Sequence, residues 1–113
     1  SLIFSVFYTN ILQKNMTLKE DRLDQNSRQL TYYIAHELNN VFVQGDGYSR
    51  NITLPQNILN YNYSVRVIDN MVYVYMETNN TYLKKTIPAN ISGSFTKGLN
   101  CLANIRGTIY VNN

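Results

Sequence analysis

The chain has 113 residues, a net charge of +3 and only 15% charged residues, with ten Tyr, four Phe and no Trp. This length fits one domain with a modest core, and 44% hydrophobic residues exclude a disordered chain. The basic excess is small and scattered, with no Lys/Arg block, so the composition gives no indication of a nucleic-acid partner.

The first stretch, from Ser1 to about Val43, contains neither Pro nor Gly and predicts one long helix. Its opening residues, SLIFSVFYTNIL, are almost wholly apolar, and the remainder is amphipathic. Apolar residues of the remainder recur at spacings of three, four or seven: Leu12, Met16, Leu23, Leu30, Ile34, Leu38 and Val41. A helix of about 43 residues would be roughly 65 Å long. It must therefore project beyond any domain that this chain can build.

The opposite face of this helix is charged and carries Lys14, Lys19, Glu20, Asp21, Arg22, Asp24 and Arg28. Acidic and basic side chains are neighbours there at helical spacing, which predicts a solvated ion-pair face. The polar run from Asp24 to Ser27 is a weak helix former. We expect the helix either to bend there or to lack packing partners. Gly45 and Gly47 then end it.

The apolar opening covers every side of its helix with Leu2, Ile3, Phe4, Val6, Phe7 and Tyr8. Residues 1–12 give roughly 18 Å of helix, against the ~30 Å of a bilayer core. Without an initiating Met or a basic n-region it does not resemble an intact signal peptide. We expect the chain to begin partway along a hydrophobic helix. The alternative is an ordinary buried helix start, although one small domain could hardly bury all these side chains.

After Tyr48 the period of the pattern changes from 3.6 to 2, which predicts strands. The predicted strands are Asn51–Leu54, Tyr63–Val67, Val72–Met76, Thr81–Ile87, Asn90–Phe95 and Leu102–Val111, the last with Ile105, Ile109 and Val111 on one face. Asp69-Asn70 and Asn79-Asn80 supply turns, because Asp and Asn tolerate a positive φ.

These elements predict an α+β fold, in which one long N-terminal helix packs by its C-terminal half on an antiparallel meander of about five or six strands. We divide the chain into the helix, residues 1–44, and a β head domain, residues 45–113, within one folding unit. Residues 1–12 form the apolar part of this helix, and residues 13–44 form its amphipathic part. We expect Leu30, Ile34, Leu38 and Val41 to cover Val65, Val67, Val72, Val74 and Ile109 on the dry face of the sheet.

The residues indicate no enzyme and no cofactor. His36 is the single histidine, and with one cysteine it cannot supply the three or four ligands of a zinc site. No Gly-rich phosphate loop or nucleophile motif occurs. The single cysteine, Cys101, excludes an internal disulfide. We expect it to be buried beside Leu99 and Leu102, the alternative being a reactive or intermolecular thiol.

Two surface features remain. Asn-x-Ser/Thr sequons occur at Asn15, Asn51, Asn62, Asn79 and Asn90, and they predict N-linked glycans if the chain crosses a membrane. The alternative is an Asn-rich turn composition with no sugar. Tyr73 and Tyr75 lie opposite the aliphatic face of their strand. They would either stabilise the sheet or form a subunit contact or ligand platform.

With its hydrophobic N-terminal helix running into an amphipathic half on a small β-sheet, the chain resembles a type IV pilin. The Asn- and Tyr-rich sheet, the sequons and the absence of a Cys pair make it most similar to archaeal pilins. The family's processing site and the Glu near the mature N-terminus are not found in SLIFSVFYTN.

The resemblance implies a subunit of an extracellular, cell-surface filament used for adhesion or surface attachment. Such a subunit waits in the membrane, is extracted by an assembly ATPase and a platform protein, and then associates with copies of itself. Residues 1–12 would then be the filament core or membrane part of the helix. The filament interface would be Leu2, Ile3, Phe4, Val6, Phe7 and Ile11. Two alternatives remain open. The chain could be a membrane-anchored binding or stator module of the archaeal motility filament that does not polymerise, or an extracellular enzyme with an unrecognised site.

Overall fold

The computed structural model describes the backbone of residues 15–112 and the side chains of residues 21–112. One helix, α2 (Asn15–Gln44), is followed by strands β1 (Ser49–Leu54), β2 (Tyr63–Ile68), β3 (Met71–Met76), β4 (Thr81–Lys85), β5 (Ile91–Gly93), β6 (Gly98–Ile105) and β7 (Thr108–Val111). The predicted α+β class is confirmed. The predicted filament interface and the apolar opening lie outside the described residues.

Helix α2 is 30 residues long and ends at Gln44. The next residue, Gly45, has a φ of 98°, and its N–H donates to the carbonyl of Phe42 at 3.2 Å. A side chain is disfavoured at that φ, so glycine closes the helix at little cost. The polar run before Arg28 does not lack packing partners, because Ser27 is fully buried. That part of the prediction was wrong.

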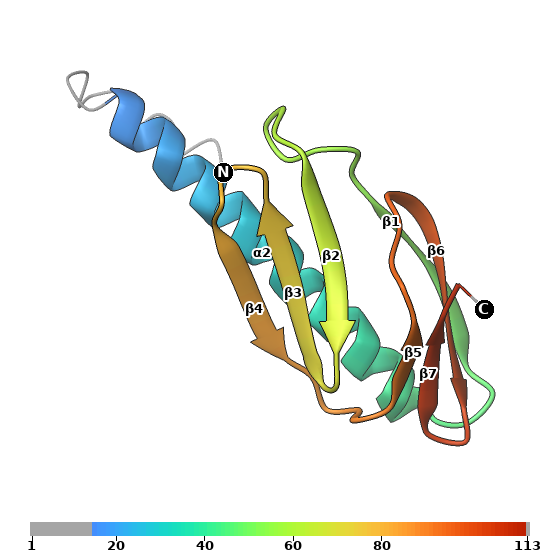
Figure 1. Ribbon diagram of the computed structural model, residues 1–113. Coiled ribbons are helices and arrows are strands. Elements are labelled where there is room, and N and C mark those ends of the chain that lie inside the picture. The colour runs from blue at the N-terminus through green and yellow to red at the C-terminus, as the bar shows by residue number, and fades with distance from the viewer. Residues whose placement is uncertain (1–14, 113) are drawn as a thin grey trace.

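The strands form two sheets instead of one meander (Figure 1). The three-stranded sheet has the order β2-β3-β4 and is the only part in which consecutive strands pair throughout. The four-stranded sheet has the order β1-β6-β7-β5 and includes a parallel pair, β5 with β7. The predicted single antiparallel sheet and the count of five or six strands are therefore corrected. Alternation predicts a strand but does not predict the strand with which it pairs. Strand β1 pairs with β6, which lies about 50 residues later, near the end of the chain.

The last predicted strand is in fact a hairpin. Arg106 and Gly107 have φ values of 53° and 85°, which makes a two-residue turn between β6 and β7. Because the chain reverses there, Ile105 pairs with Thr108 and Ile109 pairs with Asn104. Ile105 therefore points outward and is 50% exposed, whereas Ile109 is fully buried. The expectation that both lie on one face was wrong.

Helix α2 lies across one side of both sheets, and its first turns extend past the ends of the strands (Figure 1). Ile34, Leu38 and Val41 of the helix are fully buried, as are Val72, Val74, Leu102 and Ile109 of the strands. Leu30, Val65 and Val67 pack at the border of this core and stay partly exposed. The apolar stripe of the helix thus covers strands as expected, and it packs on both sheets.

The parallel pair β5–β7 depends on one glycine. A Cβ on Gly93 would lie 2.0 Å from the backbone carbonyl oxygen of Val111, and the φ of Gly93 is 99°. Any side chain there would collide with the neighbouring backbone in a conformation that it disfavours. Gly93 therefore lets this short strand close the edge of the four-stranded sheet.

Candidate functional site

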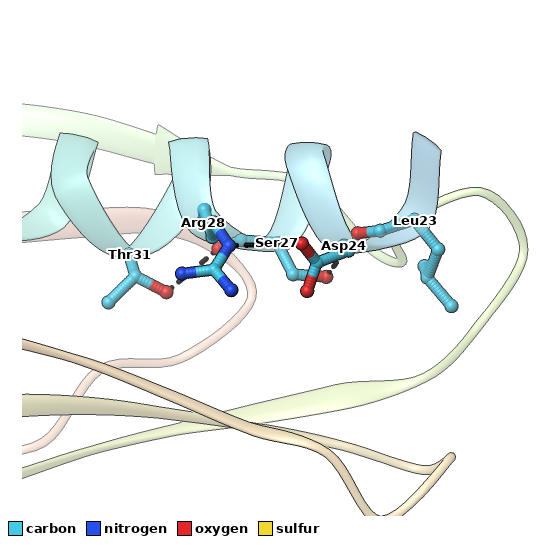
Figure 2. Close-up of polar contacts among 5 residues, drawn as sticks. All are labelled: Leu23, Asp24, Ser27, Arg28 and Thr31. Atoms are coloured by element: carbon cyan, nitrogen blue, oxygen red, sulfur yellow. Dashed lines mark hydrogen bonds and ion pairs between the residues drawn. The ribbon is translucent and has the colours of Figure 1, made fainter. Parts of the chain in front are cut away.

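The first half of α2 meets the three-stranded sheet through small hydroxyl side chains. Ser27 and Thr31 are fully buried. The hydroxyl of Ser27 donates to the Leu23 carbonyl at 2.7 Å, and that of Thr31 donates to the Ser27 carbonyl at 2.8 Å (Figure 2). Both hydroxyls are therefore satisfied within the helix itself.

Beside this buried pair, Asp24 and Arg28 form an ion pair on neighbouring turns of α2. Nε of Arg28 lies 3.0 Å from Oδ2 of Asp24, and both side chains are about half exposed (Figure 2). This pair fits the predicted solvated face. It also lies against β4, where the Arg28 guanidinium is 5.6 Å from the centroid of the Tyr82 ring.

Tyr82 of β4 lies beside the ion pair, with its ring under the Arg28 guanidinium. Hydrogen bonds from Tyr82 and Arg28 to the carboxylate lower the pKa of Asp24. Burial, followed by the hydrogen bond to Asp24, raises the pKa of Tyr82 to about 12. At neutral pH, Asp24 is therefore an ionised acceptor and Tyr82 a neutral donor.

These side chains line a cleft of about 370 Å³ between α2 and β4. Its wall consists of Asp24, Arg28, Tyr32, Asn80, Thr81, Tyr82 and Leu83, of which only Leu83 has a wholly apolar side chain. The Tyr32 side chain is 50% exposed, and Nζ of Lys84 lies 5.2 Å from the centroid of its ring. We call this feature the α2–β4 cleft.

A second opening of about 360 Å³ lies between α2 and the segment that connects β1 to β2. It is lined by Asn26, Gln29, Leu30, Tyr33, Pro55, Asn57, Ile58 and Leu59. Leu59 adopts a φ of 48° in the tight turn that the bridge between Ile58 and Tyr61 closes. No charged side chain contributes to this wall, and its polar side-chain groups are the amides of Asn26, Gln29 and Asn57 and the hydroxyl of Tyr33.

Two buried asparagines organise the four-stranded sheet, and sequence reasoning missed both. Nδ2 of Asn104 donates to the carbonyls of Val41 and Phe42 at 3.2 Å each, and its Oδ1 accepts from Gly107 N at 2.9 Å. Asn104 thus binds the last turn of α2 to the β6–β7 turn. No local pattern indicates this role, because its helix partners lie about 60 residues earlier.

Asn100 joins the other end of β6 to the C-terminal segment. Its amide donates to the carbonyls of Thr96 and Gly98 at 2.7 and 3.0 Å, and its oxygen accepts from Asn112 at 2.8 Å. Full pairing explains how so polar a side chain is completely buried.

A partly exposed ion pair between α2 and β1 was also missed. Glu37 is buried, and its Oε1 lies 2.8 Å from Nε of Arg50, whose side chain is 46% exposed. The contact satisfies the charge of Glu37, although the direction of approach is not that of a hydrogen bond. The helical pattern gave no indication of this pair, because Arg50 lies on β1, 13 residues after Glu37.

Cys101 is exposed, contrary to the expectation of a buried thiol. Side chains alternate along β6, with Asn100, Leu102 and Asn104 pointing inward, so Leu99 and Cys101 point outward. The two asparagines lie on the buried face of β6, whereas Ile105, which was predicted to share a face with Ile109, lies with Cys101 on the outer face.

The predicted glycosylation sites lie in different elements. Asn51 is on the outer face of β1, Asn79 is in the β3–β4 turn with a φ of 73°, and Asn90 precedes β5; all three are exposed. Asn62 is also exposed, and its Oδ1 accepts a hydrogen bond from Lys97. Asn15 is the first residue of α2, and its side chain is not among those described.

Tyr73 and Tyr75 lie on the outer face of β3, with stacked rings 5.9 Å apart. His36 is exposed on α2. Within residues 21–112 no group of His, Cys, Asp and Glu side chains is arranged to hold a metal ion. The part of the helix that the structure describes is not apolar enough to cross a bilayer.

We found no match to this chain among protein-family models, curated protein sequences or solved structures. Any functional conclusion therefore depends on the residues and geometry of the chain itself.

Proposed function

We propose that this chain is a structural subunit of an extracellular filament of the type IV pilus kind, assembled through its N-terminal segment. One observation carries the proposal: residues 1–12 are almost wholly apolar in sequence and as a helix would be apolar on every side, while the inward face of α2 is already covered by the two sheets. Contiguous apolar surface of several hundred Å² is more than soluble monomers usually expose. Neighbouring helices of identical subunits would bury it from all directions.

The division of the described helix into a buried face and a solvated face supports this proposal. From Leu23 onward α2 has one buried face and one solvated face, as expected of a helix that serves a folded head. Its first turns extend past the strands (Figure 1). A subunit of this kind can place its head on a filament surface and its apolar end in the filament core.

The test replaces Phe4 and Phe7 by Asp in the native host and counts surface filaments by electron microscopy. We expect assembly to be lost, because a carboxylate in an apolar helix bundle carries a large desolvation cost. The matched control is Val43→Asp at a side chain that is 69% exposed on the head end of α2. This control should assemble normally.

The folding of the head is followed separately by hydrogen exchange of the β3 amides. Loss of filaments with β3 protection intact supports the proposal. Filaments of normal number and shape in the Phe4→Asp, Phe7→Asp variant would contradict it.

A lipid bilayer would also cover the apolar segment, which favours a second candidate, a membrane-anchored binding or stator module that does not polymerise. The two candidates predict different behaviour for the protein without substitutions. A subunit forms filaments that contain it, whereas an anchored module stays monomeric in membranes at every expression level. Cross-linking followed by mass determination in native membranes separates them.

A further inference from the structure

We propose that the α2–β4 cleft binds a neutral saccharide ring. This inference goes beyond filament assembly and does not require it, because every residue of the cleft belongs to one copy of the chain. The cleft volume of about 370 Å³ is at the lower end of the range for small-molecule sites, which suits one sugar ring.

The polar groups of the cleft suit hydroxyl groups better than ions. Asp24 provides a carboxylate and Arg28 provides a guanidinium, and each neutralises the other at 3.0 Å. A free anion would meet the Asp24 carboxylate, and a free cation would meet Arg28 and the nearby Lys84. A sugar hydroxyl can donate to the carboxylate and accept from the guanidinium at the same time.

Enough hydrogen-bonding capacity remains for such a ligand. Among the described residues, Arg28 uses only its Nε–H, in the bond to Asp24, and the guanidinium has further N–H donors. The carboxylate of Asp24 has lone pairs beyond the one that Arg28 engages. The ion pair is already formed between neighbouring turns of one helix, so it requires little ordering on binding.

The edge strand contributes backbone groups. Strand β4 pairs with β3 along one side and is the outermost strand of its sheet, next to α2 (Figure 1). Its other side keeps N–H and C=O groups that the sheet does not use. Thr81, Tyr82 and Leu83 bring this part of the strand to the cleft wall.

Tyr32 provides an apolar platform for the ring. It follows Arg28 by one helical turn, and its side chain is half exposed at the cleft. The C–H groups on one face of a sugar carry a small positive charge and pack well on the negative face of an aromatic ring. Nζ of Lys84 lies over the same ring, 5.2 Å from its centroid, so the sugar would pack on the other face of the ring.

The saccharide has two possible sources. Asn79 is a sequon residue in the β3–β4 turn, directly before Asn80 and Thr81 of the cleft wall. A glycan on Asn79 would therefore start at the rim of the cleft, while a glycan of another molecule would enter from solvent. Both present the same ring chemistry to Asp24, Arg28 and Tyr32.

The experiment uses the full chain in phosphocholine micelles, since maltoside or glucoside detergents would compete for the cleft. Mannose and N-acetylglucosamine are titrated to about 50 mM and followed by amide and aromatic NMR shifts; one ring of this size should bind with a Kd of about 1–10 mM. We expect saturable shifts at Arg28, Tyr32 and Thr81. Glucuronic acid and inorganic phosphate are titrated as anionic comparisons.

Two tyrosine variants provide the matched comparison. Tyr32→Ala should weaken binding at least tenfold, whereas Tyr33→Ala, whose side chain lines the second opening, should bind as the parent does. Tyr32→Phe keeps the ring and should retain binding. Unchanged amide shifts at Val72 and Val74 show that each variant is folded.

The sugar titrations use unglycosylated protein, made in a host without the transferase, and four outcomes would overturn the inference. These are no saturable shift with either neutral sugar, binding of the anions alone, equal binding by parent and Tyr32→Ala, or pairing of an added peptide strand with β4 in place of the sugar. The outcome has no bearing on filament counts, so this inference and the filament proposal can fail separately.

The source of the sugar is distinguished with protein from the native host. If the glycan on Asn79 fills the cleft, the parent will not respond to mannose or N-acetylglucosamine, and Asn79→Asp will respond. Asp tolerates the positive φ of this turn. If both proteins respond, the cleft is open to glycans of other molecules.

Discussion

At the scale of single residues, the polar side chains that point inward have the largest effect on the structure. Asn104 is a polar side chain on the buried face of β6. It hydrogen-bonds two carbonyls at the end of α2 and one N–H of the β6–β7 turn. A buried amide is stable there because all its main hydrogen bonds are made. It joins helix, strand and turn at one point.

Asn104→Asp should therefore destabilise the protein by about 1–3 kcal/mol. The carboxylate cannot donate to the Val41 and Phe42 carbonyls, and it faces the negative end of the helix dipole. Urea unfolding measures the loss. Asn57→Asp, at an exposed loop position, is the matched control and should change stability by less than about 0.5 kcal/mol. Equal stability of both variants would contradict this role of Asn104.

Tyr63 gives the protein a stability limit at alkaline pH. The ring is 4% exposed, and its hydroxyl donates to the Pro55 carbonyl at 2.5 Å. Burial raises the pKa of Tyr63 from 10.0 to about 12. Near pH 11 the folded protein keeps this proton and the unfolded chain has released it, so higher pH favours unfolding. The contribution is complete below pH 10 and is lost as the pH rises to about 12.

A pKa difference of this size between the folded and unfolded states corresponds to about 2–3 kcal/mol in the free energy of unfolding. Urea unfolding between pH 9 and 12 should show a stability that falls less steeply in Tyr63→Phe than in the parent. Tyr33→Phe, at an exposed ring, should keep the slope of the parent. Identical slopes in all three proteins would show that Tyr63 does not retain its proton in the folded state.

At the scale of elements, helix α2 is the common support of both sheets. The two sheets share no paired strand, and both contribute fully buried side chains to the core that Ile34, Leu38 and Val41 complete. The helix is thus required for the head to fold as one unit, because it is the only described element that covers both sheets.

Ile34→Ala should cost about 2–5 kcal/mol, since it removes a fully buried side chain and leaves a cavity. His36→Ala, two residues away at an exposed position of the same helix, is the control and should be nearly neutral. Thermal or urea unfolding gives both values. A loss below about half a kilocalorie for Ile34→Ala would mean that the helix does not cover the sheets in solution.

At the scale of the whole molecule, the described residues form an elongated body 53 Å long and about half as wide. The helix sets the long axis, and its first turns extend from one end (Figure 1). The side chains on the outer face of the four-stranded sheet, among them Ser49, Asn51, Thr53, Leu99, Cys101 and Tyr110, are uncharged. A hydrated surface with little charge is consistent with the proposed position on the outside of a filament.

We predict N-linked glycans on at least two of Asn51, Asn62, Asn79 and Asn90 in protein isolated from the native host. All four are exposed, and a sequon must be accessible to be modified. The measured intact mass should exceed the polypeptide mass, and replacing a glycosylated Asn by Gln should remove one increment. The bare polypeptide mass in native material would contradict the prediction, whereas protein made in a host without the transferase would not test it.

The sequence by itself determined the elements that depend on local interactions. The 3.6-residue period of α2, the glycine after its last turn and the Asp69-Asn70 hairpin between β2 and β3 could all be predicted, because each is encoded within a few neighbouring residues. The buried helix stripe at Ile34, Leu38 and Val41 follows from the same periodicity.

Only the tertiary structure decided which strands pair and which polar residues turn inward. β1 joins β6, and β5 joins β7 in parallel, through contacts between distant parts of the chain that alternation alone cannot specify. Asn100 and Asn104 lie on the buried face of β6 and Cys101 is exposed, and the hydrogen-bond partners of both asparagines exist only after folding. The α2–β4 cleft has the same origin: Asp24, Arg28 and Tyr32 are local to the helix, whereas Tyr82 arrives from a strand more than 50 residues later.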